Sequence, residues 1–192
     1  MDFGLKNRVA IVTGASDGIG KGAAISLARE GAHVAIFARD KNRLDTAADE
    51  INDSGDGKVL ALQCDVTLNK QVIESIKKVS CHFGRVDILV NNAGTSSAAN
   101  FEDVTDDMWE ADLRLKVWGA IYCSRAVIPH MKNAHWGRII NITTPGGKAT
   151  PGGSMPTSLS RAAGISLTKA MSKDLAGDGI LVNTVCIGLI KS

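Results

Sequence analysis

The chain has 192 residues, of which 44% are hydrophobic and 22% charged, and its formal net charge is +2. This length is enough for one domain with a substantial core, and the small, scattered charge gives no case for a nucleic-acid or membrane surface. The four cysteines, Cys64, Cys81, Cys123 and Cys186, are widely separated and match no zinc site or disulfide framework. Since the sequence also shows no signal peptide and no bilayer-length apolar run, we expect a cytoplasmic protein with buried, reduced thiols.

Apolar runs of strand length alternate with segments of helical period along the whole chain. Most of the runs are nearly continuous Val, Ile and Leu, which is typical of parallel strands covered on both faces. The expected strands are residues 9–12, 33–38, 59–64, 88–91, 138–143 and 181–186, and the expected helices are 18–30, 41–53, 68–83, 106–131 and 154–176. This alternation predicts a single-domain α/β fold with a doubly wound parallel sheet of Rossmann type, in the order 3-2-1-4-5-6.

Three glycines spaced G-x-x-x-G-x-G join the first strand to the first helix. The start of a helix presents unpaired N–H groups and the positive end of the helix dipole, and glycines there let the backbone approach a diphosphate closely. A phosphate-binding P-loop is excluded because Lys21 is followed by Gly22, where that motif needs Ser or Thr. The sequence therefore predicts a dinucleotide-binding turn made by Gly14, Ser16, Asp17, Gly18, Ile19 and Gly20.

The end of the second strand indicates which dinucleotide is preferred. An acidic residue at this point accepts hydrogen bonds from a free ribose 2′-hydroxyl, whereas an arginine pairs with a 2′-phosphate. The chain has Arg39 here, with Ser16 as a second phosphate contact, and this favours NADP(H) over NAD(H). The alternative is that Arg39 is a solvated residue whose charge Asp40 offsets.

Several segments in the expected order resemble the short-chain dehydrogenase/reductase family. Four of them are the glycine turn, the tetrapeptide Asn91-Asn92-Ala93-Gly94, which stabilises the sheet in the family, and the fifth and sixth strands at 137–142 and 181–188. Another is Cys64-Asp65-Val66, in which the aspartate contacts the adenine in the family. The resemblance implies hydride transfer between a nicotinamide and a small carbonyl or alcohol substrate. It also implies cofactor contacts at Asp65, Val66, Asn92, Ala93, Gly94, Arg161, Gly188 and Ser192, the last near the carboxamide.

The four catalytic positions that the resemblance implies are all substituted. Lys116 stands where the family has Asn, Thr144 where it has Ser, Thr157 where it has Tyr, and Arg161 where it has Lys. Thr144 keeps a hydroxyl and Arg161 keeps a positive charge. A threonine hydroxyl has a pKa near that of water, about 16, against roughly 10 for a phenol. Ionising Thr157 therefore costs roughly 8 kcal/mol more, at about 1.36 kcal/mol per pKa unit, while Tyr122, the sole tyrosine, is expected to pack.

Three interpretations of this substituted site stay open. In the first, the chain is a reductase in which another group or a bound water moves the proton. Lys116 is the best replacement candidate because Arg161 would lower its pKa, although a solvated or salt-bridged lysine is the alternative. It could instead bind NADP(H) without turnover, as a sensor or interaction module. In the third, the site performs other chemistry on an NADP-bound substrate. The cluster of Lys116, Arg161 and Lys148 would favour an anionic one, with a solvated loop residue as the alternative for Lys148.

The sequence stops at Ser192, just after the last expected strand. Members of the family continue with a helical segment over the substrate and a seventh strand, so we expect a single dinucleotide-binding domain, 1–192, without that lid. A truncated chain and a shortened protein are both compatible with this ending. The helices around Trp109, Trp118 and Tyr122 and at 154–176 resemble the family's association surface, which predicts a homodimer or homotetramer.

Overall fold

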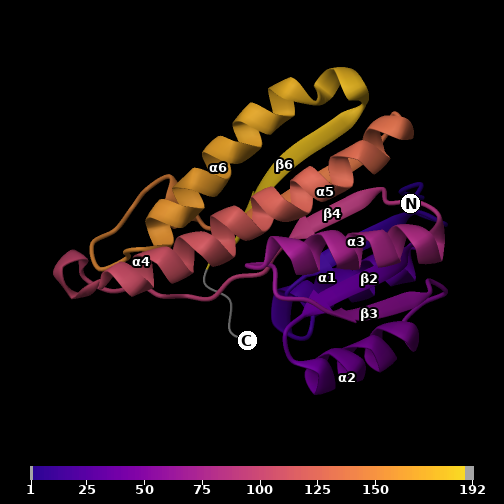
Figure 1. Ribbon diagram of the computed structural model, residues 1–192, viewed down its shortest axis with the longest axis horizontal. Helices are drawn as coiled ribbons and strands as arrows, with labels where there is room; N and C mark the ends of the chain where they lie inside the picture. The colour runs from indigo at the N-terminus through magenta and orange to yellow at the C-terminus, as the bar shows by residue number, and fades with distance from the viewer. Residues whose placement is uncertain (1, 189–192) are drawn as a thin grey trace.

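The computed structural model describes residues 2–188. Six parallel strands form one sheet in the order β3-β2-β1-β4-β5-β6 (Figure 1). The strands are β1 (Val9–Thr13), β2 (His33–Ala38), β3 (Val59–Gln63), β4 (Ile88–Asn91), β5 (Gly137–Thr143) and β6 (Ile180–Cys186). Every residue of β1 is buried, as expected for a central strand covered on both faces. The strand order reverses between β1 and β4, which is where ligands bind in folds of this type.

Helices cover the sheet on both faces. One core joins α1 (Gly18–Arg29) and α2 (Lys41–Asn52) to the sheet, and the other joins α3 (Asn69–Phe83), α5 (Gly119–Asn133) and α6 (Thr157–Asp174). A long rod in Figure 1 begins with α4 (Asp106–Leu113), passes through the π-helical turn η2 (Arg114–Trp118) and continues as α5. Short 3-10 turns lie at η1 (Phe101–Asp103), η3 (Pro145–Gly147) and η4 (Ala176–Asp178).

The predicted fold class and strand order are confirmed, while two helices differ from the prediction. A single helix was predicted over 106–131, but the π turn interrupts it, and hydrophobic periodicity does not reveal one extra residue in a turn. The last helix was predicted from residue 154 and begins at Thr157. Met155 precedes a proline, which disfavours helical backbone, and it pairs instead with Ala99.

The cysteines were expected to be buried, which is wrong for two of them. All four cysteines are free, Cys64 and Cys123 in the core and Cys81 and Cys186 exposed. Within residues 2–188, no helix is both long enough and apolar enough to cross a membrane.

A buried polar network crosses the sheet beneath the ligand edge. Asn91 donates to Asn141 Oδ1 at 2.8 Å, and Asn141 donates to Thr168 Oγ1 at 2.8 Å. Thr168 in turn donates to the Gly164 carbonyl and accepts from Thr184, so the network joins β4, β5, α6 and β6. Buried polar groups are costly unless paired, so this network fixes how α6 sits against the sheet.

Replacing Asn141 with Ala is expected to lower the free energy of unfolding by about 2 kcal/mol, because two buried hydrogen bonds are lost and Asn91 loses a partner. Urea denaturation followed by circular dichroism measures the effect. The control is Asn183→Ala, an exposed asparagine on the neighbouring strand β6, for which a change within about 0.5 kcal/mol is expected. Equal effects of the two substitutions would show that the network contributes nothing.

Candidate functional site

The glycine turn between β1 and α1 is held tightly against the loop after β4. Gly14 has a φ of +63°, and a Cβ on it would lie 2.9 Å from the Ala93 Cα. A Cβ on Gly20 would lie 2.3 Å from the Gly14 carbonyl oxygen. The Asn92 side chain donates to the Thr13 and Gly14 carbonyls, both at 3.0 Å. Asn92 therefore fixes the shape of the turn.

The start of α1 faces open space beside this turn. Gly18 has a φ of +54°, and a Cβ added to it would lie more than 4 Å from any neighbouring atom. The Asp17 side chain caps the helix by accepting from the Gly18 N–H, and it pairs with Arg43 at 2.5 Å. The Gly18 N–H bond and the Arg43 charge hold the pKa of Asp17 below its ordinary value. Asp17 therefore shapes the turn by capping the helix. Ile19, two residues later, is 36% exposed.

A cleft of about 600 Å³ runs from the glycine turn to the ends of β2 and β3. Predicted cofactor residues from separate parts of the chain line it together: Gly14, Ser16, Arg39, Asp65, Val66, Ala93 and Gly94. The Asp65 carboxylate is held in place by the Thr67 N–H and hydroxyl, at 2.9 and 2.8 Å. The volume falls in the range typical of small-ligand sites.

Arg39 is exposed at the edge of this cleft. Within residues 2–188, no carboxylate lies within ion-pair distance of its guanidinium. Asp40, which was expected as a possible partner, instead caps α2 by accepting from the Arg43 N–H at 3.1 Å. The cleft therefore carries a free guanidinium beside the ribose end of the expected cofactor site.

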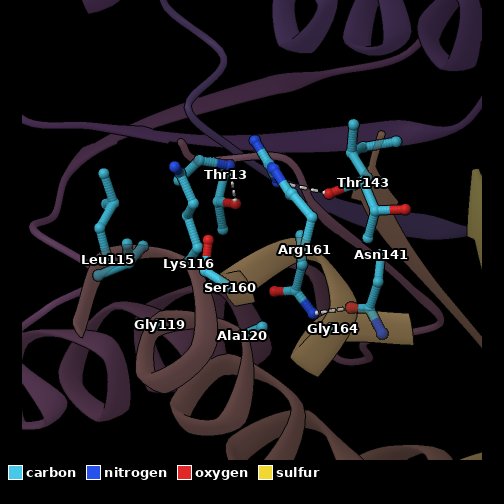
Figure 2. Close-up of a pocket in the computed structure, with 14 residues that line it drawn as sticks. Thr13, Leu115, Lys116, Gly119, Ala120, Asn141, Thr143, Ser160, Arg161 and Gly164 are labelled. Atoms are coloured by element: carbon cyan, nitrogen blue, oxygen red, sulfur yellow. Dashed lines mark hydrogen bonds between the residues drawn. The ribbon is translucent and has the colours of Figure 1, made fainter. Parts of the chain in front are cut away.

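A second, narrower cavity of about 20 Å³ lies between the ends of β1, β4 and β5, the turn η2 and helix α6. Figure 2 shows Lys116 and Arg161, from η2 and α6, entering it alongside Thr13 and Asn141. Thr143 lines this cavity, whereas the predicted Thr144 lies just beyond it at the start of η3.

Lys116 joins two predicted site residues into one group. It is 7% exposed, its ammonium pairs with the buried Asp112 one helical turn earlier, and it donates to Thr157 Oγ1 at 3.2 Å. Thr157 Oγ1 also accepts from the Ser97 N–H at 3.0 Å. Both acceptor positions of the hydroxyl are thus filled, which leaves its own proton available for donation.

Arg161 lies on the other side of the cavity. Its Nη1 donates to the Ile142 carbonyl at 2.7 Å, and its Nη2 lies 2.8 Å from where a Cβ on Gly94 would be. Its Nε is buried and has no hydrogen-bond partner within residues 2–188. Arg161 therefore borders the same loop that closes the cofactor cleft.

Burial lowers the pKa of Lys116 below its ordinary value, and the Arg161 charge lowers it further, while the Asp112 carboxylate opposes both effects. Burial likewise lowers the pKa of Arg161, with Asp112 opposing, although a guanidinium stays protonated. The site thus combines one fixed cation with one ammonium whose proton can be exchanged.

Other predicted residues fall outside this cluster. Tyr122 packs against Trp118 and the core, as expected. Lys148 is exposed, and Gly188 is exposed with nothing within 4 Å of an added Cβ. Ser192 lies outside the described residues.

Sequence reasoning missed Asp112 altogether. The i, i+4 spacing of Asp112 and Lys116 on a helix was the available signal. Such pairs usually lie on an exposed helix face, and only the packing of α4 and η2 against α6 makes this one buried.

Comparisons with known proteins agree with this architecture. The profile of the short chain dehydrogenase family matches residues 8–192. An uncharacterized oxidoreductase of Staphylococcus saprophyticus is 37% identical over 188 residues, which are 98% of this chain and 80% of that protein. The 3-oxoacyl-(acyl-carrier-protein) reductase FabG of Staphylococcus epidermidis is 36% identical, over 97% of this chain and 76% of its own length. The crystal structure of NAD⁺-bound xylitol dehydrogenase is 31% identical, with a TM-score of 0.94 over 98% of this chain and 72% of that one.

Proposed function

This chain belongs to the short-chain dehydrogenase/reductase family of oxidoreductases, and we propose that it is an NADP(H)-dependent reductase of a small carbonyl compound with an atypical proton donor. The observation that carries the proposal is the contact between the buried Lys116 ammonium and the Thr157 hydroxyl. The contact supports the proposal because Thr157 stands where the resemblance implies the family's catalytic tyrosine, and the Lys116 ammonium could supply a proton there.

The residues around the cleft suit a dinucleotide. The open start of α1 at Gly18 is positioned for the diphosphate, and Asp65 and Val66 border the adenine end. We assign Ala93, Gly94 and Arg161 to the nicotinamide ribose, because Ala93 and Gly94 line the cleft and Ala93 and Arg161 line the adjoining small cavity. Gly188 and Ser192 remain proposed contacts on the strength of the family resemblance. When bound, the cofactor supplies the hydride.

The preference for NADP(H) rests on Arg39. Its guanidinium is free of carboxylates within residues 2–188 and lines the cleft together with Ser16, so it can pair with a 2′-phosphate through two parallel hydrogen bonds. A relative named for a bound NAD⁺ shares the fold, so the choice of cofactor has to be measured on this chain.

Arg39→Ala is expected to weaken NADPH binding by roughly 10- to 100-fold, because a hydrogen-bonded charge contact contributes about 1.5–3 kcal/mol. NADH binding should stay within about twofold, since NADH has no 2′-phosphate. Fluorescence titration of both nucleotides measures this. Arg29→Ala, an exposed arginine at the far end of α1, is the control and should change neither affinity. An equal loss for NADPH and NADH would rule out recognition of the 2′-phosphate.

Proton transfer follows from the contacts of Thr157. In the proposed reduction, the Thr157 hydroxyl would give its proton to the carbonyl oxygen of the substrate, and Lys116 would give a proton to Thr157 Oγ1. The product is an alcohol, Thr157 is again a hydroxyl, and the neutral Lys116 amine takes a proton from water. Because the two transfers are concerted, the chain avoids the roughly 8 kcal/mol excess cost of a free threonine alkoxide, at about 1.36 kcal/mol per pKa unit. In this scheme Arg161 orients the ribose, and Thr144 is left to contact the substrate at the rim.

A carbonyl panel assayed for NADPH oxidation at 340 nm tests the proposed activity. Consumption of NADPH that depends on one class of ketone or aldehyde is the expected result. Tight NADPH binding with no turnover of any carbonyl compound, and no reverse reaction with the matching alcohols and NADP⁺, would favour the binding module instead.

The proposal extends to assembly and location. Trp118 and Leu159, on η2 and α6, are 45% and 44% exposed, which suits association of copies through these helices as a homodimer or homotetramer. Sedimentation giving a single species of one chain mass would contradict it. Four free cysteines suit the reducing cytoplasm.

A further inference from the structure

The ion pair between Asp112 and Lys116 is unusual in being almost entirely buried. The side chains are 1% and 2% exposed. Taking two charges out of water costs several kcal/mol per ion, and a well-packed apolar pair of similar volume is often at least as stable. Stability alone is therefore a weak reason for this pair.

Its geometry points toward Thr157. The Lys116 ammonium contacts both Asp112 Oδ1 and Thr157 Oγ1, so the nitrogen that the carboxylate holds is also the one that donates to the hydroxyl. The second carboxylate oxygen, Oδ2, is buried without a hydrogen-bond partner in the described part of the chain. A purely structural carboxylate would be expected to have both oxygens satisfied.

The charges that face Lys116 come from two helices. Asp112 lies on α4 and attracts the ammonium, whereas Arg161 lies on α6 and repels it. The loop after β4, residues 94–97, packs here with only amides and hydroxyls. Burial and Arg161 favour the neutral amine, and among residues 2–188 Asp112 is the facing group that favours the ammonium.

We propose that Asp112 is a positioning residue: it keeps Lys116 charged and holds its Nζ against the Thr157 hydroxyl, ready for proton donation. This inference rests on the proposed function for the use of the proton. The coupling of Asp112 to the charge of Lys116 is a separate property that does not require turnover.

Asp112→Asn tests it, because asparagine keeps the shape and an acceptor oxygen but loses the charge. The titration of Lys116 is followed by NMR of lysine labelled with ¹³C at Cε, its resonance assigned with Lys116→Arg. We expect the pKa of Lys116 to fall by at least about one unit, a tenfold change in acidity. The proposed reduction needs the Lys116 ammonium, so the reduction rate falls as pH rises through the pKa of Lys116. In Asp112→Asn this decrease in rate should occur at a lower pH, shifted by as much as the pKa of Lys116. Asp112→Glu, which restores the charge, should return both curves toward those of the parent.

The outcomes separate the two proposals. An unchanged Lys116 titration in Asp112→Asn, with folding verified by circular dichroism, would overturn the role of Asp112. A shifted titration with an unshifted rate profile would support the Asp112 coupling and remove Lys116 as proton donor. If the parent protein turns over no carbonyl compound, the NMR titration still decides the coupling, and the proposed reductase activity fails alone.

Discussion

Removing the Lys116 amine is expected to lower kcat for carbonyl reduction by about 10²- to 10⁴-fold, the usual contribution of a positioned acid. Lys116→Met alone would leave Asp112 charged, buried and unpaired, at a stability cost of about 3–5 kcal/mol. The measurement is therefore made in an Asp112→Asn background, comparing Asp112→Asn with Asp112→Asn/Lys116→Met below the pH at which the lysine deprotonates. NADPH affinity should stay within about threefold, since the Lys116 ammonium contacts Thr157 and Asp112, neither of which lines the 600 Å³ cleft.

Controls for this prediction come from two positions. Lys169→Met removes an exposed lysine on α6 and should leave kcat unchanged. Thr157→Val, which removes the hydroxyl but keeps the shape, should reduce kcat about as much as the loss of Lys116, whereas Thr157→Ser should retain most of it. If the lysine can be removed without a change in kcat or in the pH profile, Lys116 is a structural lysine and the proton comes from elsewhere. If Thr157→Val is fully active, the hydroxyl takes no part in the relay.

The fold was predictable because its signals are local. Continuous β-branched runs such as the one in β1 are typical of strands buried on both faces, and their alternation with helical segments predicts a parallel sheet with one strand order. The signal for the glycine turn was equally local. Gly14 and Gly18 adopt positive φ, and the glycines and their flanking residues lie close together in the sequence. The π turn at Lys116 was not predictable, because an extra residue within a helix leaves the apolar spacing nearly unchanged.

The chemistry of the substituted site depended on contacts across long stretches of chain. Lys116 and Thr157 are 41 residues apart, and nothing near either residue in the sequence indicates that the ammonium donates to the hydroxyl. The likeness to known motifs located both positions but gave no account of how the replacements interact. Asp112 was not predicted as a site residue, because its burial depends on the packing of helices against one another and not on its neighbours in the sequence. The same holds for Arg39. The sequence does not show that the Asp40 side chain caps α2 instead of pairing with the Arg39 guanidinium.

The glycine turn allows a second large effect to be predicted. In Gly20→Ala the new Cβ would lie 2.3 Å from the Gly14 carbonyl oxygen and 2.5 Å from Asn92 Nδ2. Both neighbours are fixed, since Gly14 is backbone and Asn92 is tied by two hydrogen bonds of 3.0 Å. The turn must open, so we expect the free energy of unfolding to fall by about 1–3 kcal/mol, the usual cost of overpacking. NADPH affinity should fall at least about tenfold, because the N–H groups at the start of α1 are displaced.

Gly22 is the matched control for this prediction, two residues further along α1. An added Cβ there meets nothing within 4 Å, and alanine is a better helix former than glycine by roughly 0.5–1 kcal/mol. Gly22→Ala should therefore raise the free energy of unfolding by about that amount and leave NADPH affinity unchanged. Urea denaturation measures both stability changes. If they have opposite signs, the loss of stability in Gly20→Ala comes from the contact between the turn and the helix and not from helix propensity. If Gly20→Ala instead binds NADPH as tightly as the parent, the close packing of the turn is not what prepares α1 for the diphosphate.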